Sequence, residues 1–161
     1  MNSLKNVIVL IEDPRQLHEC AQLMTSTDPW KVLGFTTEQC EKALCDIEMK
    51  VTGFMQDGKV IAFLASLATG ISFEPLIEYL CVDKSMRSQG LGTQLIKHFE
   101  EELFPNSKNL YMFVSDINPR AMSLYERLGY VKVGTWENYN IVGQTEFLMR
   151  KTRGVKLHTY F

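Results

Sequence analysis

Apolar and polar residues alternate along this chain in periods that switch between those of strands and those of helices. Apolar runs with strand character stand at residues 7–11, 50–55, 60–68, 76–82, 110–114, 130–135 and 146–151. Helical spacing of apolar residues occupies 14–24, 37–47, 91–103 and 119–128. These periods predict the element order β-α-α-β-β-β-α-β-α-β-β. The order favours an α+β fold, an α/β/α sandwich whose mixed, mostly antiparallel sheet of about seven strands carries helices on both faces.

Turn and cap signals set the limits of these elements. Asp57-Gly58 is a strong hairpin signal between the second and third strands, and Gly70 is expected in the turn before the fourth. Asn118-Pro119 joins a good N-cap to a residue suited to the first helical turn, and Gly129 can close that helix. Residues 25–36 are predicted to be a loop.

The helical periods also predict which side chains face the core. The inward face of the second helix is expected to carry Cys40, Ala43, Leu44 and Ile47. The inward face of the third is expected to carry Leu95, Ile96, Phe99 and Leu103, with Glu100 placed elsewhere. The basic run at residues 150–153 is expected to be the solvated end of a strand.

Composition excludes several classes of protein. A length of 161 residues without a linker or repeat predicts one domain over residues 1–161, and a formal net charge of -2 argues against binding nucleic acid mainly by charge. No apolar run reaches the roughly 18 residues of a membrane span, and the N-terminus lacks a signal-peptide pattern. We therefore expect a cytoplasmic protein that binds neither membrane nor nucleic acid.

The four cysteines and three histidines show no metal-ligand pattern. None of the cysteines forms a Cys-x-x-Cys pair, and the histidines are scattered. We therefore expect no metal and four reduced, buried thiols; the cysteines are Cys20, Cys40, Cys45 and Cys81.

The segment at 82–93, Val-Asp-Lys-Ser-Met-Arg-Ser-Gln-Gly-Leu-Gly-Thr, leads from an apolar strand into an amphipathic helix. Its glycines allow backbone N–H groups to approach a ligand closely because no Cβ stands in the way. The free N–H groups and dipole of the following helical turn favour an anion. The segment therefore predicts a phosphate-bearing ligand near residues 87–93.

Three classes of ligand use loops of this kind. A nucleoside triphosphate site would have a lysine directly after its last glycine, whereas Thr93-Gln94 follow Gly92. A dinucleotide fold would have a third glycine where Leu95 stands, and its loop would lie early in the chain. These departures leave the pyrophosphate of coenzyme A as the third option.

A second segment adds a family resemblance. Residues 118–130 read Asn-Pro-Arg-Ala-Met-Ser-Leu-Tyr-Glu-Arg-Leu-Gly-Tyr, one strand after Arg87-Ser88-Gln89-Gly90-Leu91-Gly92. In this order, the two segments resemble the GNAT superfamily of N-acetyltransferases, whose hallmarks are Gln/Arg-x-x-Gly-x-Gly/Ala and Asn-x-x-Ala-x-x-Leu-Tyr-Glu-x-x-Gly-Phe/Tyr. The resemblance covers about residues 76–130. It implies the acyl-CoA N-acyltransferase fold, acetyl-CoA as donor, and direct acetyl transfer in a ternary complex to a primary amine of a small molecule or peptide.

The resemblance also implies which residues hold the donor. The strand end at 80–82 would pair with the pantetheine arm and splay from the strand at 110–114, and a backbone N–H near Cys81 or Val82 would polarise the thioester carbonyl. Arg87 would add charge-assisted hydrogen bonds, unless it is a solvated loop arginine. Asn118 would touch the pantetheine, cap its helix, or do both. The full predicted donor-binding set is Leu80, Cys81, Val82, Arg87, Ser88, Gln89, Gly90, Leu91, Gly92, Thr93, Asn118 and Tyr125.

Two residues are predicted to carry the chemistry. Tyr125 matches the family's general acid, which donates to the departing sulfur; the alternative is a packing aromatic. Glu78 interrupts an apolar strand and is our candidate base, with a solvated or salt-bridged glutamate as the alternative. Some relatives place the base where this chain has Phe113, and Asp116 is a second choice. Cys81 is disfavoured as a nucleophile because no histidine lies near it in sequence and the family transfers directly.

The acceptor side is less well defined. Deprotonating a lysine amine at pH 7 costs about 4.6 kcal/mol, against about 1.4 kcal/mol for an α-amine, so a base matters most for the former. Trp30, Phe35 and Tyr139 are candidates for the wall of the acceptor site or for core packing. The tail at 155–161 is an extra edge strand or a dimer contact, and the chain is a monomer or homodimer. A coenzyme A-binding module without turnover is the rival to an enzyme.

Overall fold

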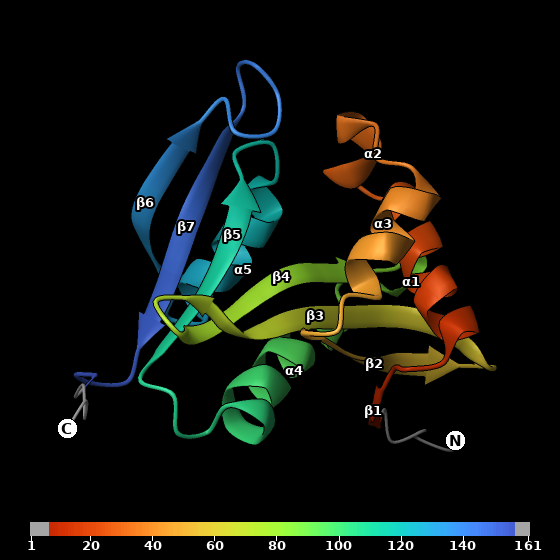
Figure 1. The fold of residues 1–161 in the computed structure, drawn as a ribbon, viewed down its shortest axis with the longest axis horizontal. Helices are drawn as coiled ribbons and strands as arrows, with labels where there is room; N and C mark the ends of the chain where they lie inside the picture. Colours follow the sequence, from red (N-terminus) through yellow and green to blue (C-terminus); the bar gives the residue numbers. More distant parts are fainter. Residues whose placement is uncertain (1–6, 157–161) are drawn as a thin grey trace.

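The computed structural model describes residues 7–156, and its centre is a seven-stranded sheet in the order β1-β2-β3-β4-β5-β7-β6 (Figure 1). The strands are β1 Ile8–Leu10, β2 Met49–Gln56, β3 Lys59–Ile71, β4 Glu74–Val82, β5 Asn109–Ser115, β6 Val131–Glu137 and β7 Thr145–Thr152. The α-helices are α1 Pro14–Thr25, α2 Trp30–Leu33, α3 Thr37–Leu44, α4 Leu91–His98 and α5 Pro119–Arg127. A 3-10 turn at Lys84–Met86 precedes α4, and a π-helical turn at Phe99–Leu103 extends it.

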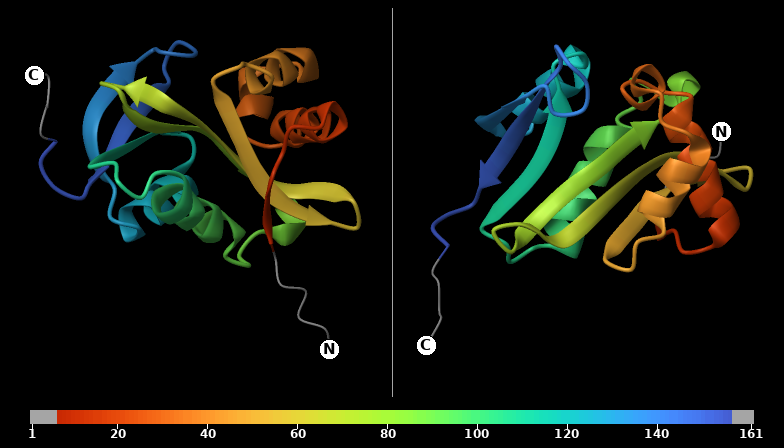
Figure 2. Two further views of the ribbon diagram at one scale, coloured as in Figure 1. Left: turned by 60° about the horizontal axis from the view of Figure 1, so that its bottom comes forward. Right: turned by 45° about the horizontal axis from the view of Figure 1, so that its top comes forward.

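The sheet is covered on both faces, as the sequence predicts. Helices α1 and α3 bury their apolar sides on one face, while α4 and α5 pack on the other (Figures 1 and 2). Every neighbouring pair of strands is antiparallel except β4–β5, which is parallel. The predicted mixed, mostly antiparallel sheet of an α/β/α sandwich is therefore confirmed. In the described part of the chain, no helix is long and apolar enough to cross a membrane.

The turn between β3 and β4 lies two residues later than predicted. Gly70 belongs to β3, and the turn is made by Ser72 and Phe73, whose φ angles are 50° and 61°. A Cβ at Gly70 would overlap the Leu76 side chain on the facing strand. The glycine therefore allows close strand packing rather than a turn.

The α3 region departs from the prediction at its end. A capping box joins Thr36 and Gln39 at its start, but the helix ends at Leu44. Ile47, expected to face inwards, lies beyond this end and is 99% exposed. Cys45 is also exposed, so three of the four cysteines are buried rather than all four. The predicted loop at 25–36 contains the four-residue helix α2.

Glu100 lies inside the protein, contrary to the prediction from helical period. Its side chain is 6% exposed and lies in the π-helical turn, four residues after the buried Ile96. Its carboxylate accepts a hydrogen bond of 3.0 Å from the Tyr130 hydroxyl and pairs with Lys151 at 2.7 Å. Arg153 donates to the carbonyls of Glu100, Phe104 and Ser107. Lys151 and Arg153 thus anchor the end of the α4 region instead of forming a solvated strand end.

Replacing Lys151 by methionine should lower the free energy of unfolding by about 2–3 kcal/mol, because it leaves the Glu100 carboxylate buried without a cation. The loss is below that of a fully buried pair since the Lys151 side chain is 26% exposed. Chemical denaturation measures it, with Lys97→Met on the exposed side of α4 as the control. Adding Glu100→Gln should recover much of the loss. Equal stability of the Lys151 and Lys97 variants would contradict this role.

Candidate active site

The sheet opens between β4 and β5, as the resemblance implies. The two strands pair through Leu76 with Tyr111 and Ile77 with Met112, and the described strands carry no further pair beyond Ile77. The opening begins at a β-bulge, because Ser66 of β3 faces Ile77 while the preceding residue faces Tyr79. Glu78 is therefore the extra residue. A bulge bends its strand, and β4 turns away from β5 beyond it (Figure 1).

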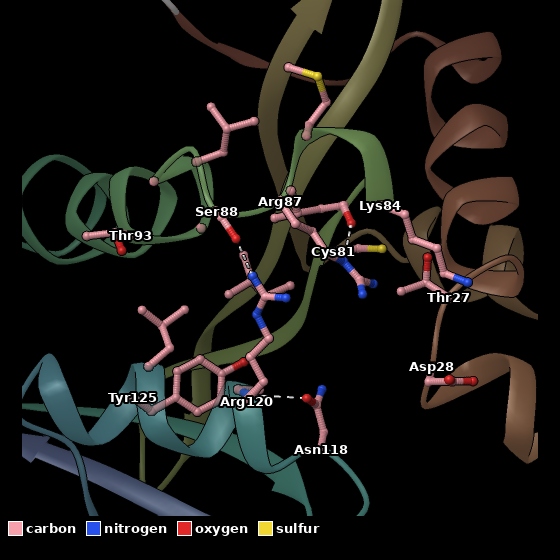
Figure 3. Close-up of a pocket in the computed structure, with 18 of the residues that line it drawn as sticks. Thr27, Asp28, Cys81, Lys84, Arg87, Ser88, Thr93, Asn118, Arg120 and Tyr125 are labelled. Atoms are coloured by element: carbon pink, nitrogen blue, oxygen red, sulfur yellow. Dashed lines mark hydrogen bonds between the residues drawn. The ribbon is translucent and has the colours of Figure 1, made fainter.

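The glycine-loop pocket, a cavity of about 570 Å³, occupies part of this opening (Figure 3). It lies between the end of β4, the start of α4 and the inner side of α5. Of the twelve residues predicted to hold the donor, all except Gln89 line it. The Gln89 amide instead lies 3.9 Å from the Met86 sulfur. The fold thus brings Arg87 and Tyr125, which are 38 residues apart in sequence, to the same cavity.

The loop itself has the backbone of an anion site. Gly90 is the N-cap of α4 with φ 79°, a left-handed conformation that a side chain disfavours. Gly92 plays a different part: a Cβ there would lie 3.6–3.9 Å from Leu124, Val82 and Leu80. The second glycine therefore packs between β4 and α5. The first turn of α4, residues 91–93, lines the pocket. The N–H groups of a first helical turn have no partner within the helix, and they therefore favour binding of a phosphate.

Four basic side chains line the glycine-loop pocket, and the sequence predicted only one of them. They are Lys84, Arg87, Arg120 and Arg127. Arg120 donates to the Ser88 hydroxyl at 2.7 Å and so joins α5 to the loop (Figure 3). Helical spacing could have indicated Arg120 and Arg127, since residues 120, 124 and 127 share one face of α5 and Leu124 also lines the pocket.

The direction of the backbone hydrogen bonds of β4 decides which N–H groups face the opening. The N–H of Asp83 donates to the carbonyl of Ile61 in β3 at 2.9 Å. In an antiparallel pair only every second residue bonds to the partner strand, so Cys81 bonds to β3 as Asp83 does. The N–H of Val82 then points into the opening. Of the two predicted positions for an oxyanion donor, this alternation favours Val82.

Tyr125 projects from α5 into the glycine-loop pocket (Figure 3) and is 6% exposed. Burial, with a smaller contribution from nearby Cys81, raises the pKa of its hydroxyl well above the ordinary value. No hydrogen bond to this hydroxyl is found within residues 7–156. The group therefore stays protonated near neutral pH and is available to donate to a ligand.

A second cavity, the aromatic pocket, has a volume of about 290 Å³ and lies between α2, α3, β4, β5 and the β6–β7 loop. All three aromatic residues proposed for an acceptor wall line it, together with Phe113; they are Trp30, Phe35 and Tyr139. Leu80, Asn118 and Tyr125 line both pockets. Two ligands, one in each pocket, would therefore meet at Tyr125.

The two candidate bases, Glu78 and Asp116, differ in their position relative to the pockets. Glu78 lines the aromatic pocket, is partly buried, and has no ion-pair partner in the part of the chain that the structure describes. Burial raises the pKa of its carboxyl above the ordinary value. Asp116 lines neither pocket, is exposed, and accepts a hydrogen bond of 3.2 Å from the backbone N–H of Thr145. Burial also raises the pKa of the Cys81 thiol to about 12, so little thiolate exists at neutral pH.

Asn118 serves as the N-cap of α5, where its side chain accepts a hydrogen bond of 3.2 Å from the N–H of Ala121. It also lines both pockets, so the cap and a ligand contact are compatible. A further carboxylate, Glu146 of β7, lines the aromatic pocket and is 7% exposed. The sequence did not indicate Glu146 as a site residue, because a glutamate at the start of an apolar strand is normally interpreted as the solvated end of that strand.

Fold and site together define a coenzyme A-type acyltransferase, and sequence comparison agrees. The model of the acetyltransferase (GNAT) family matches residues 17–130. The chain belongs to this family and is an N-acetyltransferase. It is 30% identical to the [ribosomal protein bS18]-alanine N-acetyltransferase of Escherichia coli over 112 residues, 69% of this chain and 70% of that protein. It is 25% identical to N-alpha-acetyltransferase RimI of Mycobacterium tuberculosis over 137 residues, 83% of this chain and 82% of that protein.

Solved structures share the fold at lower identity. The ribosomal-protein-S18-alanine N-acetyltransferase from Escherichia coli superposes with a TM-score of 0.77 at 20% identity, covering 97% of this chain and 99% of that one. An aminoglycoside 6'-N-acetyltransferase complexed with coenzyme A gives a TM-score of 0.75 at 17% identity, covering 94% of this chain and 99% of that one. These matches confirm the acyl-CoA N-acyltransferase fold and leave the acceptor open.

Proposed function

We propose that this enzyme transfers the acetyl group of acetyl-CoA to a primary amine by direct attack within a ternary complex. The observation that carries the proposal is the position of Tyr125, whose side chain forms a wall shared by the glycine-loop pocket and the aromatic pocket. Donor in the first pocket and acceptor in the second would place thioester and amine beside one hydroxyl group. Holding two reactants in this way removes much of the entropic barrier of a bimolecular step.

The glycine-loop pocket fits the donor in its charge and shape. The N–H groups from Gln89 to Thr93 would bind the pyrophosphate, and the basic side chains around them would neutralise its charge. The pantetheine arm would extend along the unpaired edge of β4 at residues 80–82. The N–H of Val82 would then polarise the thioester carbonyl, where negative charge develops during attack. That a structural relative is complexed with coenzyme A supports this assignment.

Proton transfer accompanies the attack. Glu78, directly or through water, would take a proton from the ammonium of the acceptor, because a neutral amine is the nucleophile. The amine nitrogen then bonds to the carbonyl carbon and loses one of its two protons to water, the carbon–sulfur bond breaks, and the thiolate of coenzyme A leaves. Tyr125 would stabilise this thiolate by donating its hydroxyl proton in a hydrogen bond. The high pKa of Cys81 favours direct transfer over an acetyl-cysteine intermediate.

Thermal denaturation with acetyl-CoA, coenzyme A or ATP tests the donor. Acetyl-CoA and coenzyme A should each raise the melting temperature and ATP should not, because the loop lacks the lysine of a triphosphate site. Thiol release from acetyl-CoA with peptide N-termini, lysine, polyamines, amino acids and aminoglycosides then tests transfer. Stabilisation without release with any amine would support the module without turnover. No stabilisation by either coenzyme would reject the proposed donor site.

Arg120→Ala should raise KM for acetyl-CoA about fivefold to tenfold, because it removes a cation from the pocket and its hydrogen bond to Ser88. The value of kcat should stay within about twofold since Arg120 lines the glycine-loop pocket and not the aromatic pocket that we assign to the acceptor. Initial rates against acetyl-CoA concentration measure both constants. Arg15→Ala, on the exposed start of α1, is the control. An unchanged KM in the Arg120 variant would remove this side chain from the donor site.

A further inference from the structure

The aromatic pocket contains two carboxylates and no cation. Glu78 comes from the bulge of β4, and Glu146 comes from the start of β7. Among the described residues that line the pocket there is no lysine, arginine or histidine. Carboxylates in a confined space are costly unless a positive charge accompanies them. The absence of a cation among these lining residues therefore suggests that the ligand of this pocket is positively charged.

Glu146 is held in place but not neutralised. Its Oε1 accepts a hydrogen bond of 3.0 Å from the Asn140 amide and a longer one of 3.4 Å from the Gln144 amide. Gln144 in turn donates to the Ser115 hydroxyl, which fixes its position. The Ser115 hydroxyl is a further neutral partner of this carboxylate, and among residues 7–156 no cation pairs with it. A carboxylate that is more than nine-tenths buried on the wall of a cavity thus has only neutral hydrogen-bond partners in the described part of the chain.

The groups around Glu146 increase the attraction for a cation. Burial raises the pKa of Glu146, and hydrogen bonds from Asn140 and Ser115 partly offset this rise. Asp116, in the turn after β5, is a like charge that makes a smaller contribution in the same direction as burial. The nearest basic side chain on the same face of β7 is Arg150, four residues along a strand, which places it about 13 Å away. Arg150 does not line the pocket. A bound ammonium would supply the positive charge that the described lining residues of the pocket lack.

Aromatic rings flank this carboxylate. Phe113 and Trp136 have ring centroids 5.0 Å apart, and the Phe113 ring stacks with Tyr139 at 6.5 Å. Trp136 is the β6 neighbour of Glu146, and Tyr139 lines the pocket. Aromatic faces beside a carboxylate attract organic cations, whose alkyl parts they also cover. Rings and carboxylate together form a site for an ammonium group.

We infer that the acceptor is a small amine with at least two positive charges, one bound by Glu146 while the other amine is acetylated at Tyr125. The inference rests on the proposed function, because it assigns the aromatic pocket to the acceptor. Glu78 serves the reacting amine, which must lose its proton, whereas Glu146 serves an ammonium that keeps its charge. Diamines, polyamines and other polycationic amines have this chemistry. A peptide N-terminus without a basic side chain does not.

The matched substrates cadaverine and n-pentylamine test the inference, since they differ by a second ammonium at the same chain length. The wild-type enzyme should prefer cadaverine by about tenfold or more in kcat/KM, beyond the factor of two from its two equivalent amines. Glu146→Gln should lower the cadaverine value about tenfold and leave the n-pentylamine value within about twofold. Glu137→Gln, an exposed charge change on β6, should alter neither.

The outcomes separate the two proposals. Release of coenzyme A with no amine would count against the proposed function, whatever Glu146 does. Equal rates with both amines, or an equal loss for both in Glu146→Gln, would overturn the inference and leave the function standing. The inference would also be overturned if the best acceptor were a neutral peptide that begins with alanine and if Glu146→Gln did not change the rate of its acetylation. If the variant does not fold, calorimetric binding of the two amines to the wild-type complex with coenzyme A decides: tighter binding of cadaverine supports the inference and equal binding overturns it.

Discussion

Replacing Tyr125 by phenylalanine is expected to lower kcat by about 10²–10³-fold, with KM for acetyl-CoA close to that of the wild type. The variant keeps the ring that lines both pockets and loses only the hydroxyl that we propose donates to the departing sulfur. Because burial raises the pKa of this hydroxyl, it remains a donor throughout the usual assay range. Its titration should therefore produce no basic limb in the pH profile of the wild-type enzyme.

Tyr111→Phe is the matched control for this experiment. It removes the same atom from a β5 tyrosine that lines neither pocket, and it should leave kcat unchanged. A thermal shift with coenzyme A confirms that each variant still binds the donor. An unchanged kcat for Tyr125→Phe at all pH values would make Tyr125 a packing aromatic and remove it from the mechanism.

Glu78→Gln is expected to lower kcat/KM at neutral pH by about 10²-fold for an acceptor with a lysine-like amine. The base must be ionised to act, so the wild-type value should rise as pH climbs through the raised pKa of this carboxyl. The variant should lose that acidic limb. The effect should be smaller for an α-amine, whose deprotonation is easier. Rates over a pH series with both kinds of acceptor measure it, and an unshifted acidic limb would exclude Glu78 as the base.

Glu78→Gln, which should lower activity, should raise or preserve the thermal stability of the enzyme at neutral pH. The folded state raises the pKa of Glu78 by burying it, so it favours the protonated form. The stability that this proton provides is complete below the unfolded-state pKa and is lost as pH rises through the folded-state value. Glu78→Gln should therefore melt at or above the wild-type temperature at neutral pH, and the difference should vanish in acid. Glu48→Gln, an exposed change, should show no such dependence.

Local signals predicted most of the fold. The strands and the longer helices follow from their apolar periods, and the hairpin at Asp57-Gly58 from its turn residues. The failures occur where tertiary contacts override the local pattern. Gly70 allows close packing against Leu76 instead of turning, and Glu100 is buried against Tyr130 and Lys151. The first contact depends on the register between β3 and β4, and the second on residues distant in sequence, so periodicity alone could not reveal either.

The parts of the site that lie in one continuous segment were predicted, whereas the parts that depend on contacts between distant segments were not. The glycine loop is one continuous segment, and all of its predicted residues except Gln89 line a cavity. The bulge at Glu78 depends on the register between β3 and β4, which the sequence does not display. Glu146 and Arg120 become part of the pockets only through the packing of β7 and α5. The roles of all these side chains are predictions that the variants above test.

The direct transfer of an acetyl group across the shared wall at Tyr125 is the central claim. It is tested by mixing the enzyme with acetyl-CoA, with and without each amine of the acceptor panel, and analysing small molecules and intact protein by mass spectrometry. The account predicts equal amounts of coenzyme A and N-acetylated amine, formed only when an accepted amine is present, and an unchanged protein mass. An acetyl group on the protein that passes to the amine, or no acetylation of any amine by enzyme that binds acetyl-CoA, would contradict it.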